Sequence, residues 1–199
     1  MTIPRILSAL AALALVAGCA SKVDAPAQYD LGLLPNVAAS SAAALPALSV
    51  ADVNAPAWLD NSMIFFRLAY ANEQQPRPYA SSRWTMPPAQ LFQQRLKARL
   101  AQAGGAVLAM SDAALNVPLL RIDMDDFTQT FDTPTHSVAT LQVRASLFNG
   151  RLLLAQKSFS SRVDAPSADA AGAARAFVSA NDAVIGDMMN WLASVAPKK

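Results

Sequence analysis

Residues 140–163 have the sequence TLQVRASLFNGRLLLAQKSFSSRV, in which two alternating runs meet at Asn149-Gly150. Before the turn, apolar residues occupy the odd positions from 141 to 147, and after it Ala155, Phe159 and Val163 stand among polar neighbours. Asparagine and glycine both tolerate the positive φ angles of a tight two-residue turn. The stretch therefore predicts a β-hairpin with one face toward a core.

Further strands are predicted on the N-terminal side of this hairpin. The strongest is in residues 116–126, where apolar and charged side chains follow a strict period of two. Shorter or less regular β-prone runs occupy residues 48–53, 63–68 and 106–110.

Two helices complete the predicted fold. Pro87-Pro88, followed by apolar residues at helical spacing up to Gly104-Gly105, predicts a helix of about 15 residues. A long amphipathic helix is predicted between Ser167 and Pro197. These elements predict a single compact α/β domain with a mixed, largely antiparallel sheet and helices packed on it.

The N-terminus has the pattern of a lipoprotein signal peptide. Arg5 precedes an apolar run over residues 6–17, and Ala17-Gly18 stand directly before Cys19. The run of about 12 residues is too short to span a bilayer, which needs about 20. The sequence around Cys19 is similar to the bacterial lipobox, in which the cysteine is acylated, with palmitate as an expected chain. An ordinary signal peptide with a chance cysteine is the alternative.

The sequence after the lipobox predicts an anchored domain on a tether. Residues 1–18 are expected to be the signal peptide, 19–45 the lipidated cysteine and a flexible tether, and 46–199 the folded domain. The apolar patch 29–34 interrupts the tether and can dock on the domain as a short strand. Ala20 stands where inner-membrane lipoproteins of enteric bacteria typically carry Asp, so this resemblance implies the outer membrane.

Composition argues against several classes of function. The 199 residues include 16 basic and 14 acidic side chains without a basic run, so nucleic acid is not an expected partner. One Cys and one His disfavour a disulfide framework, a Cys/His zinc site and a Cys/His nucleophile pair. No glycine-rich phosphate-binding motif is present in the sequence. We therefore expect no cofactor and no enzymatic activity.

Two groups of polar residues are candidate sites. His136 with Asp132 allows a serine triad on paper, but an exposed histidine in a turn is favoured because no nucleophile elbow is present. Asp123, Asp125, Asp126 and Asp132 could ligate a hard cation. The solvent-facing side of a strand is the favoured interpretation, because the EF-hand spacing is absent.

A series of spaced residues resembles a known family. It comprises Leu48-x-Val50-x-x-Val53-x-x-Pro56-x-Trp58-Leu59-Asp60-x-x-x-Ile64-x-x-Arg67, followed by Tyr79-x-x-x-Arg83-Trp84-x-x-Pro87. Together with the lipobox and Tyr29, this order is similar to the ABC-type transport auxiliary lipoproteins, which include the paraquat-inducible protein C lipoproteins. The resemblance implies a mixed sheet between helices. It also implies a periplasm-facing outer-membrane lipoprotein that binds an MCE-domain protein of a lipid transport system.

The same series supplies the candidate contact or structural residues: Tyr29, Trp58, Asp60, Arg67, Tyr79, Arg83 and Trp84. Trp84 is expected to pack the start of the following helix against the sheet, and Arg83 to pair with Asp60. The alternative role of Arg83 and Trp84 is docking to a transport partner. A module that binds a lipid or hydrophobic solute in its own pocket is the alternative function, and homo-oligomerisation stays open.

Overall fold

The computed structural model describes residues 25–34, 47–109, 112 and 117–195. Its elements in chain order are β1 Ala27–Tyr29, β2 Leu48–Val50, β3 Met63–Leu68, β4 Asn72–Trp84, α2 Pro88–Gln102, β5 Val107–Ala109, β6 Leu119–Thr133, β7 His136–Asn149, β8 Leu152–Asp164 and α3 Ala170–Val195.

All eight of these strands form one mixed sheet. The long strands β6, β7 and β8 pair antiparallel, as do β3 and β4. The three-residue strands β1, β2 and β5 pair parallel to their neighbours. Along the edge of β6 opposite β7, β2 pairs near the start of the strand and β3 near its end. The predicted α/β class with a mixed sheet is confirmed.

The predicted hairpin is confirmed, but its two-residue turn is Gly150-Arg151 rather than Asn149-Gly150, because Asn149 is the last residue of β7. Asn149 pairs with Leu152, and Gly150 adopts a φ of 57°, which an L side chain rarely adopts. The register then brings the apolar odd positions of β7 onto the helix side, where Leu141, Val143 and Leu147 are all buried. The even positions of β7 point to the other side of the sheet.

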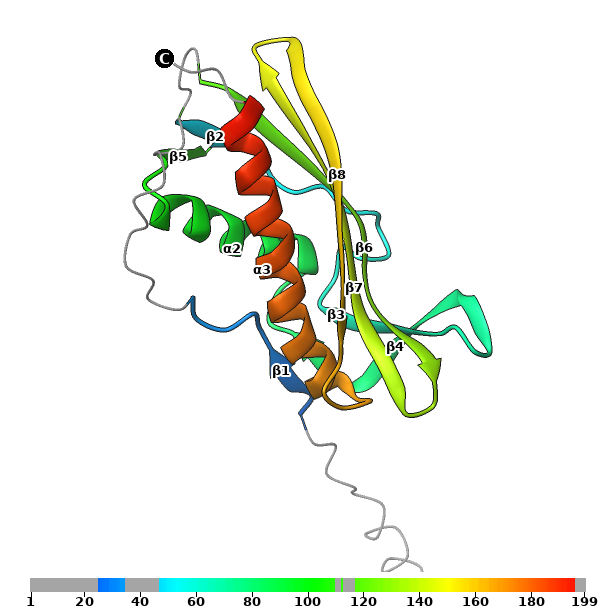
Figure 1. Ribbon diagram of the computed structural model, residues 1–199. Coiled ribbons are helices and arrows are strands. Elements are labelled where there is room, and N and C mark those ends of the chain that lie inside the picture. The colour runs from blue at the N-terminus through cyan, green and yellow to red at the C-terminus, as the bar shows by residue number, and fades with distance from the viewer. Residues whose placement is uncertain (1–24, 35–46, 110–111, 113–116, 196–199) are drawn as a thin grey trace, which may run out of the picture.

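Figure 1 shows α2 and α3 on the same side of the sheet. α3 packs over β7 and β8, and α2 packs against α3 and β5. The expectation of a sheet between helices is therefore corrected. We call the other side of the sheet, where neither α2 nor α3 lies, the open face.

Two long stretches of strand were not predicted. β4 carries Pro76 and Pro78 and is largely exposed, so it has neither the alternation nor the hydrophobicity of a half-buried strand. Figure 1 shows the β3–β4 hairpin projecting from the body of the molecule. β6 continues past residue 126 to Thr133 after a register shift between Met124 and Asp126. That bulge breaks the period of two on which the sequence prediction depended.

The prediction for the N-terminal segment is also corrected. Residues 27–34, expected within a flexible tether, lie against the folded domain, and we call them the strap. β1 pairs with β4 in register from Ala27 to Tyr29, so the strand overlaps the predicted docking patch 29–34 only at Tyr29. Leu31, at 4% exposure, belongs to the hydrophobic core. The folded unit therefore begins well before residue 46.

Candidate partner-binding site

Trp84 lies in the core. Only 2% of it is exposed, and its ring packs edge-on against Phe127 of β6 and Phe177 of α3 at 5.6 Å. Those two rings stack on each other at 4.0 Å. The three rings join β4, β6 and α3, so Trp84 fixes the long helix to the sheet. Its expected packing at the start of α2 stays a prediction.

Arg83 does not form the expected pair. Its Nη1 donates hydrogen bonds to the carbonyl oxygens of Tyr79 and Ser82, within its own strand. Among the ion pairs of the described residues, none joins Arg83 to Asp60. Asp60 is exposed beside α2, at a cleft of about 500 Å³ that it shares with Lys97. The expected Arg83–Asp60 pair is therefore wrong.

Tyr79 anchors a polar network on the helix side of the sheet. Its hydroxyl donates to Gln129 Oε1 at 2.7 Å, and Gln129 Nε2 donates to Ser137 Oγ at 2.7 Å. Burial, with a smaller contribution from the carboxylate of Asp169, raises the pKa of Tyr79. The phenol is therefore a neutral hydrogen-bond donor that links β4, β6 and β7.

Trp58 and Arg67 come together at the border of the open face. The Arg67 guanidinium carbon lies 5.4 Å from the centre of the Trp58 ring, and Phe65 packs edge-on against the same ring at 5.4 Å. Arg67 also donates to the carbonyl of Glu73 at 3.0 Å. A guanidinium over an indole face is held electrostatically, which keeps the charge near an apolar plate.

Arg67 also borders a polar pocket on the open face. The pocket has a volume of about 370 Å³ and is lined by residues of five strands, β3, β4, β6, β7 and β8. Its lining residues are Arg67, Glu73, Gln74, Asp126, Thr130, Thr140, Gln142 and Arg162. Asp126 accepts a hydrogen bond from Thr128 at 2.8 Å.

The carboxyl of Asp126 has an unusual environment for a surface strand. Burial raises the pKa of Asp126, although the Thr128 hydrogen bond and the charges of Arg67 and Arg162 act in the opposite direction. Asp126 therefore ionises less readily than an exposed Asp. Sequence reasoning grouped it with Asp123 and Asp125, because only the bulge after Met124 separates their environments.

The other residues weighed as catalytic or metal-binding lie apart. Asp123 pairs with Arg144 at 3.5 Å, and His136 Nδ1 lies 2.7 Å from Asp132 Oδ1 in an exposed position. Ser137 is 1% exposed and accepts the hydrogen bond from Gln129. Within the described ranges, no three His, Cys, Asp or Glu side chains are arranged to hold a metal ion.

The hydrogen bond to Asp132 raises the pKa of His136 above its usual 6.5, and the same contact lowers the pKa of Asp132. The two groups therefore favour each other's charged form across the slightly acidic range. His136 Nε2 also lies 3.6 Å from Asp164, which reinforces the protonated imidazole.

Arg95 of α2 is a buried charge that sequence reasoning missed. Its Nε and Nη2 donate to the two carboxylate oxygens of Asp182 in α3, at 2.9 and 2.8 Å. Its Nη1 donates to the carbonyl oxygen of Leu31 in the strap at 2.7 Å. One guanidinium thus joins both helices to the strap, which we call the Arg95 clamp. The sequence signal was the position of Arg95 inside the apolar stripe, between Phe92 and Leu96.

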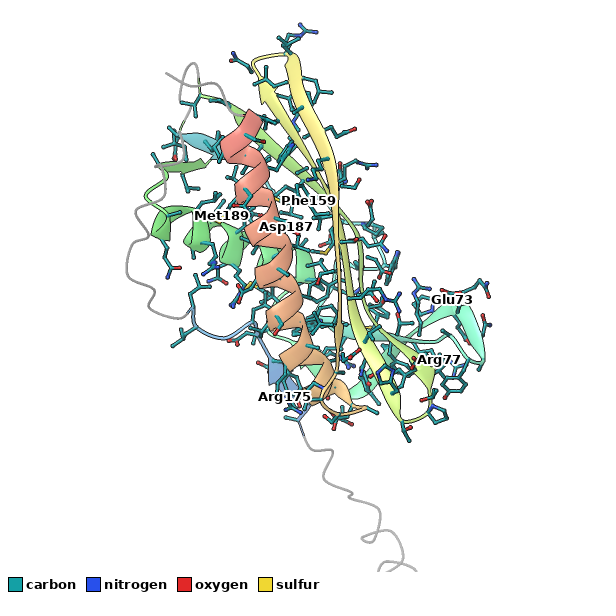
Figure 2. The ribbon with its side chains drawn as sticks, in the orientation of Figure 1. Glu73, Arg77, Phe159, Arg175, Asp187 and Met189 are labelled. Carbon is teal, nitrogen blue, oxygen red and sulfur yellow. The ribbon has the colours of Figure 1, made fainter. Side chains whose placement is uncertain are left out.

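Clefts lie on both sides of the strap. One, of about 460 Å³, faces α2 and is bordered by Leu31, Leu33, Leu34 and Leu91, with Arg95 at its base. The other, of about 330 Å³, lies between β1 and the first turns of α3. Figure 2 places Arg175 at this end of α3, beside β1.

Cys19, the predicted lipidation site, lies outside the described residues. In the part of the chain that the structure describes, no helix has the length and hydrophobicity needed to cross a membrane.

The chain is similar to known proteins in both sequence and fold. Residues 29–188 match the sequence model of a family described as the ABC-type transport auxiliary lipoprotein component. The chain is similar to a solved protein of Xanthomonas campestris from the family DUF330, with 22% identity and a TM-score of 0.68 over 84% of this chain and 94% of that one.

A second solved structure, described only as an uncharacterized protein, is similar at 13% identity with a TM-score of 0.66. The alignment covers 85% of this chain and 99% of the other. Identities this low show a common fold. Among curated protein sequences, none matches this chain significantly.

Proposed function

We propose, because the chain belongs to the family of ABC-type transport auxiliary lipoprotein components, that it is a lipid-anchored, non-catalytic subunit of an MCE-type intermembrane lipid transport system. In this role it faces the periplasm from the outer membrane, where it binds an MCE-domain protein and positions it. The observation that carries the proposal is the match of residues 29–188 to this family, downstream of a lipobox-like sequence at Cys19.

The anchor is supported by the order of features around Cys19. An apolar run, two small residues and the cysteine follow one another, and several acyl chains give stable membrane attachment. Cys19→Ser should abolish the acyl mass and release the protein from membranes, as measured by mass spectrometry and fractionation. Ala20→Asp should keep the acyl mass but move the protein to the inner membrane. An unchanged distribution for Ala20→Asp would contradict the outer-membrane assignment.

Partner binding is supported by the open face, which none of the helices in the described residues covers. Trp58 and Arg67 supply an aromatic plate with a charge above it, a combination that is enriched at energetically important interface positions. Crosslinking in cells, followed by mass spectrometry, should recover an MCE-domain protein with the native chain. Arg67→Ala should reduce that crosslink, whereas Arg144→Ala, elsewhere on the same face, should change it less. Recovery of no MCE-domain protein would contradict the proposal.

A non-catalytic role is supported by the positions of the polar residues. His136 is exposed on a turn, and the Ser137 hydroxyl beside it is buried and bonded to Gln129. The Ser137 hydroxyl is therefore not available as a nucleophile that His136 could activate. Asp132 serves His136 as an ion-pair partner at a surface turn.

A second candidate is a module that carries a lipid or hydrophobic solute itself. The cleft of about 460 Å³ beside the strap favours it, because four leucines border this cleft and Leu33 is 97% exposed. Native mass spectrometry of the protein purified from membranes should then show a bound lipid that Leu91→Asp removes. A spectrum of the unmodified protein without bound lipid contradicts this candidate and leaves the first proposal standing.

A further inference from the structure

The strap shortens the link between the predicted anchor and the folded domain. If the chain joined the domain only at residue 46, its contour from Cys19 would reach about 95 Å, at no more than about 3.6 Å per residue. β1 begins at Ala27, eight residues after Cys19. The same limit then allows a contour of only about 29 Å between the acylated residue and the sheet.

The strap is attached at more than one point. β1 pairs with β4 over residues 27–29, and the amide of Thr85 donates to the carbonyl of Tyr29 at 2.8 Å. Leu31 is buried in the core, and its carbonyl accepts the hydrogen bond from the Arg95 clamp. Since a backbone pairing, an apolar side chain and a charged donor all hold the same segment, the domain cannot move farther from its anchor than the contour between Cys19 and Ala27 allows without breaking these contacts.

The position of β1 selects one end of the molecule. β1 borders the same cleft as residues 171–178, the first turns of α3. The β7–β8 turn lies at the opposite end of the molecule, as Figure 1 shows. α3 alone spans about 39 Å between these ends, at 1.5 Å per residue over its 26 residues.

We infer that the strap holds the domain in one orientation at the membrane, with the β1 end toward the lipid and the β7–β8 turn away from it. The inference rests on the proposed acylation of Cys19. The inference concerns how the domain is positioned and does not require the β1 end to adsorb to the lipid surface. This end presents the carboxylates of Asp30 and Asp169. Leu152 and Leu153, exposed by 66% and 47% at the far end, then point toward the periplasm.

The test is energy transfer on vesicles of phosphatidylcholine that contain a small fraction of headgroup-labelled acceptor lipid. Cys19 is the only cysteine, and acylation blocks its thiol, so a single added cysteine takes the donor dye. Arg175→Cys and Arg151→Cys form a matched pair, because both replace an exposed arginine at opposite ends. Transfer from position 175 should exceed transfer from position 151 roughly twofold or more, given a separation of the order of the α3 length.

Two further variants test the strap itself. Insertion of 20 Gly and Ser residues between Asp24 and Ala25 adds about 70 Å of contour without touching the domain, so it should remove the difference between the two positions. Arg95→Ala should narrow the difference, provided that circular dichroism shows a folded domain. An unchanged difference after the insertion would overturn the role of chain length, and an unchanged difference in Arg95→Ala would overturn the role of the clamp.

Failure of the orientation is distinguishable from failure of the anchor. An acylated protein that floats with the vesicles, yet shows equal transfer from both positions, overturns the inference and leaves the proposed function intact. A protein without acyl mass that does not float overturns the proposed anchor and the inference with it.

Discussion

The two faces of the sheet are built from the same strands but put to different uses. On the helix side, β7 contributes Leu141 and Val143 to a core that Trp84 completes. On the open face, the alternate residues of β7 include Gln142 and Arg144, which are exposed. One face therefore stabilises the fold, whereas the other exposes polar and charged groups to solvent. Substitutions on the two faces should change the free energy of unfolding by different amounts, and a substitution at Asp126 should change it in the opposite direction.

The largest difference is expected between two tryptophans. Trp84→Ala should lower the free energy of unfolding by about 3–5 kcal/mol, because it empties a buried site against the stacked rings of Phe127 and Phe177. Trp58→Ala should cost only about 1 kcal/mol, since its ring is half-buried at the border of the open face. Urea denaturation of both variants measures the contrast. Equal midpoints would break the distinction between the faces.

Two arginines, one on each side of the sheet, should differ in how much their ion pairs stabilise the fold. Arg95→Ala should destabilise the domain by about 2–4 kcal/mol, because it leaves Asp182 and the Leu31 carbonyl without their donor. Arg144→Ala removes an exposed ion pair with Asp123 and should cost at most about 0.5 kcal/mol. Thermal unfolding of the two variants at one pH and salt concentration tests this. A large loss for Arg144→Ala would contradict it.

Replacing Asp126 should stabilise the fold, whereas the other substitutions destabilise it. Because burial raises its pKa, ionising Asp126 costs stability as the pH rises from its ordinary 3.8 through the raised folded value. Asp126→Asn should therefore increase the free energy of unfolding at neutral pH and flatten its dependence on pH in the acid range. Asp125→Asn, an exposed neighbour, is the matched control. Partner binding that falls while stability rises would assign Asp126 to function.

The smallest expected effect is at His136. Its raised pKa means that it stabilises the fold below the unfolded value of 6.5 and loses that contribution as the pH rises through the folded value. The melting temperature of the native chain should fall slightly over this window, and that fall should vanish in His136→Asn. Since His136 is the only histidine, an NMR titration reads its pKa directly. A value below 6.5 would refute the ion pair with Asp132.

The candidate site was predictable only in part. Trp58, Arg67 and Tyr79 belong to the motif series that resembles the auxiliary lipoprotein family, and the structure brings Trp58 and Arg67 into contact. The assignment of Arg83 to Asp60 was wrong, because a long side chain on a strand can satisfy itself on nearby carbonyls. Asp126 was indistinguishable from its neighbours, since its burial depends on β3 and β8, which are remote in sequence.

The sequence by itself determined the elements whose side chains repeat with a local period and whose ends carry turn residues. These include the β7–β8 hairpin with Gly150, and both helices. Tertiary structure alone decided that α2 and α3 lie on one face, that β4 forms a long strand between β1 and β3, and that the strap closes against α2. The physical reason is separation along the chain: Arg95 meets Asp182 87 residues away and Leu31 64 residues away. Such contacts exist only after the chain has folded, so no local pattern encodes them.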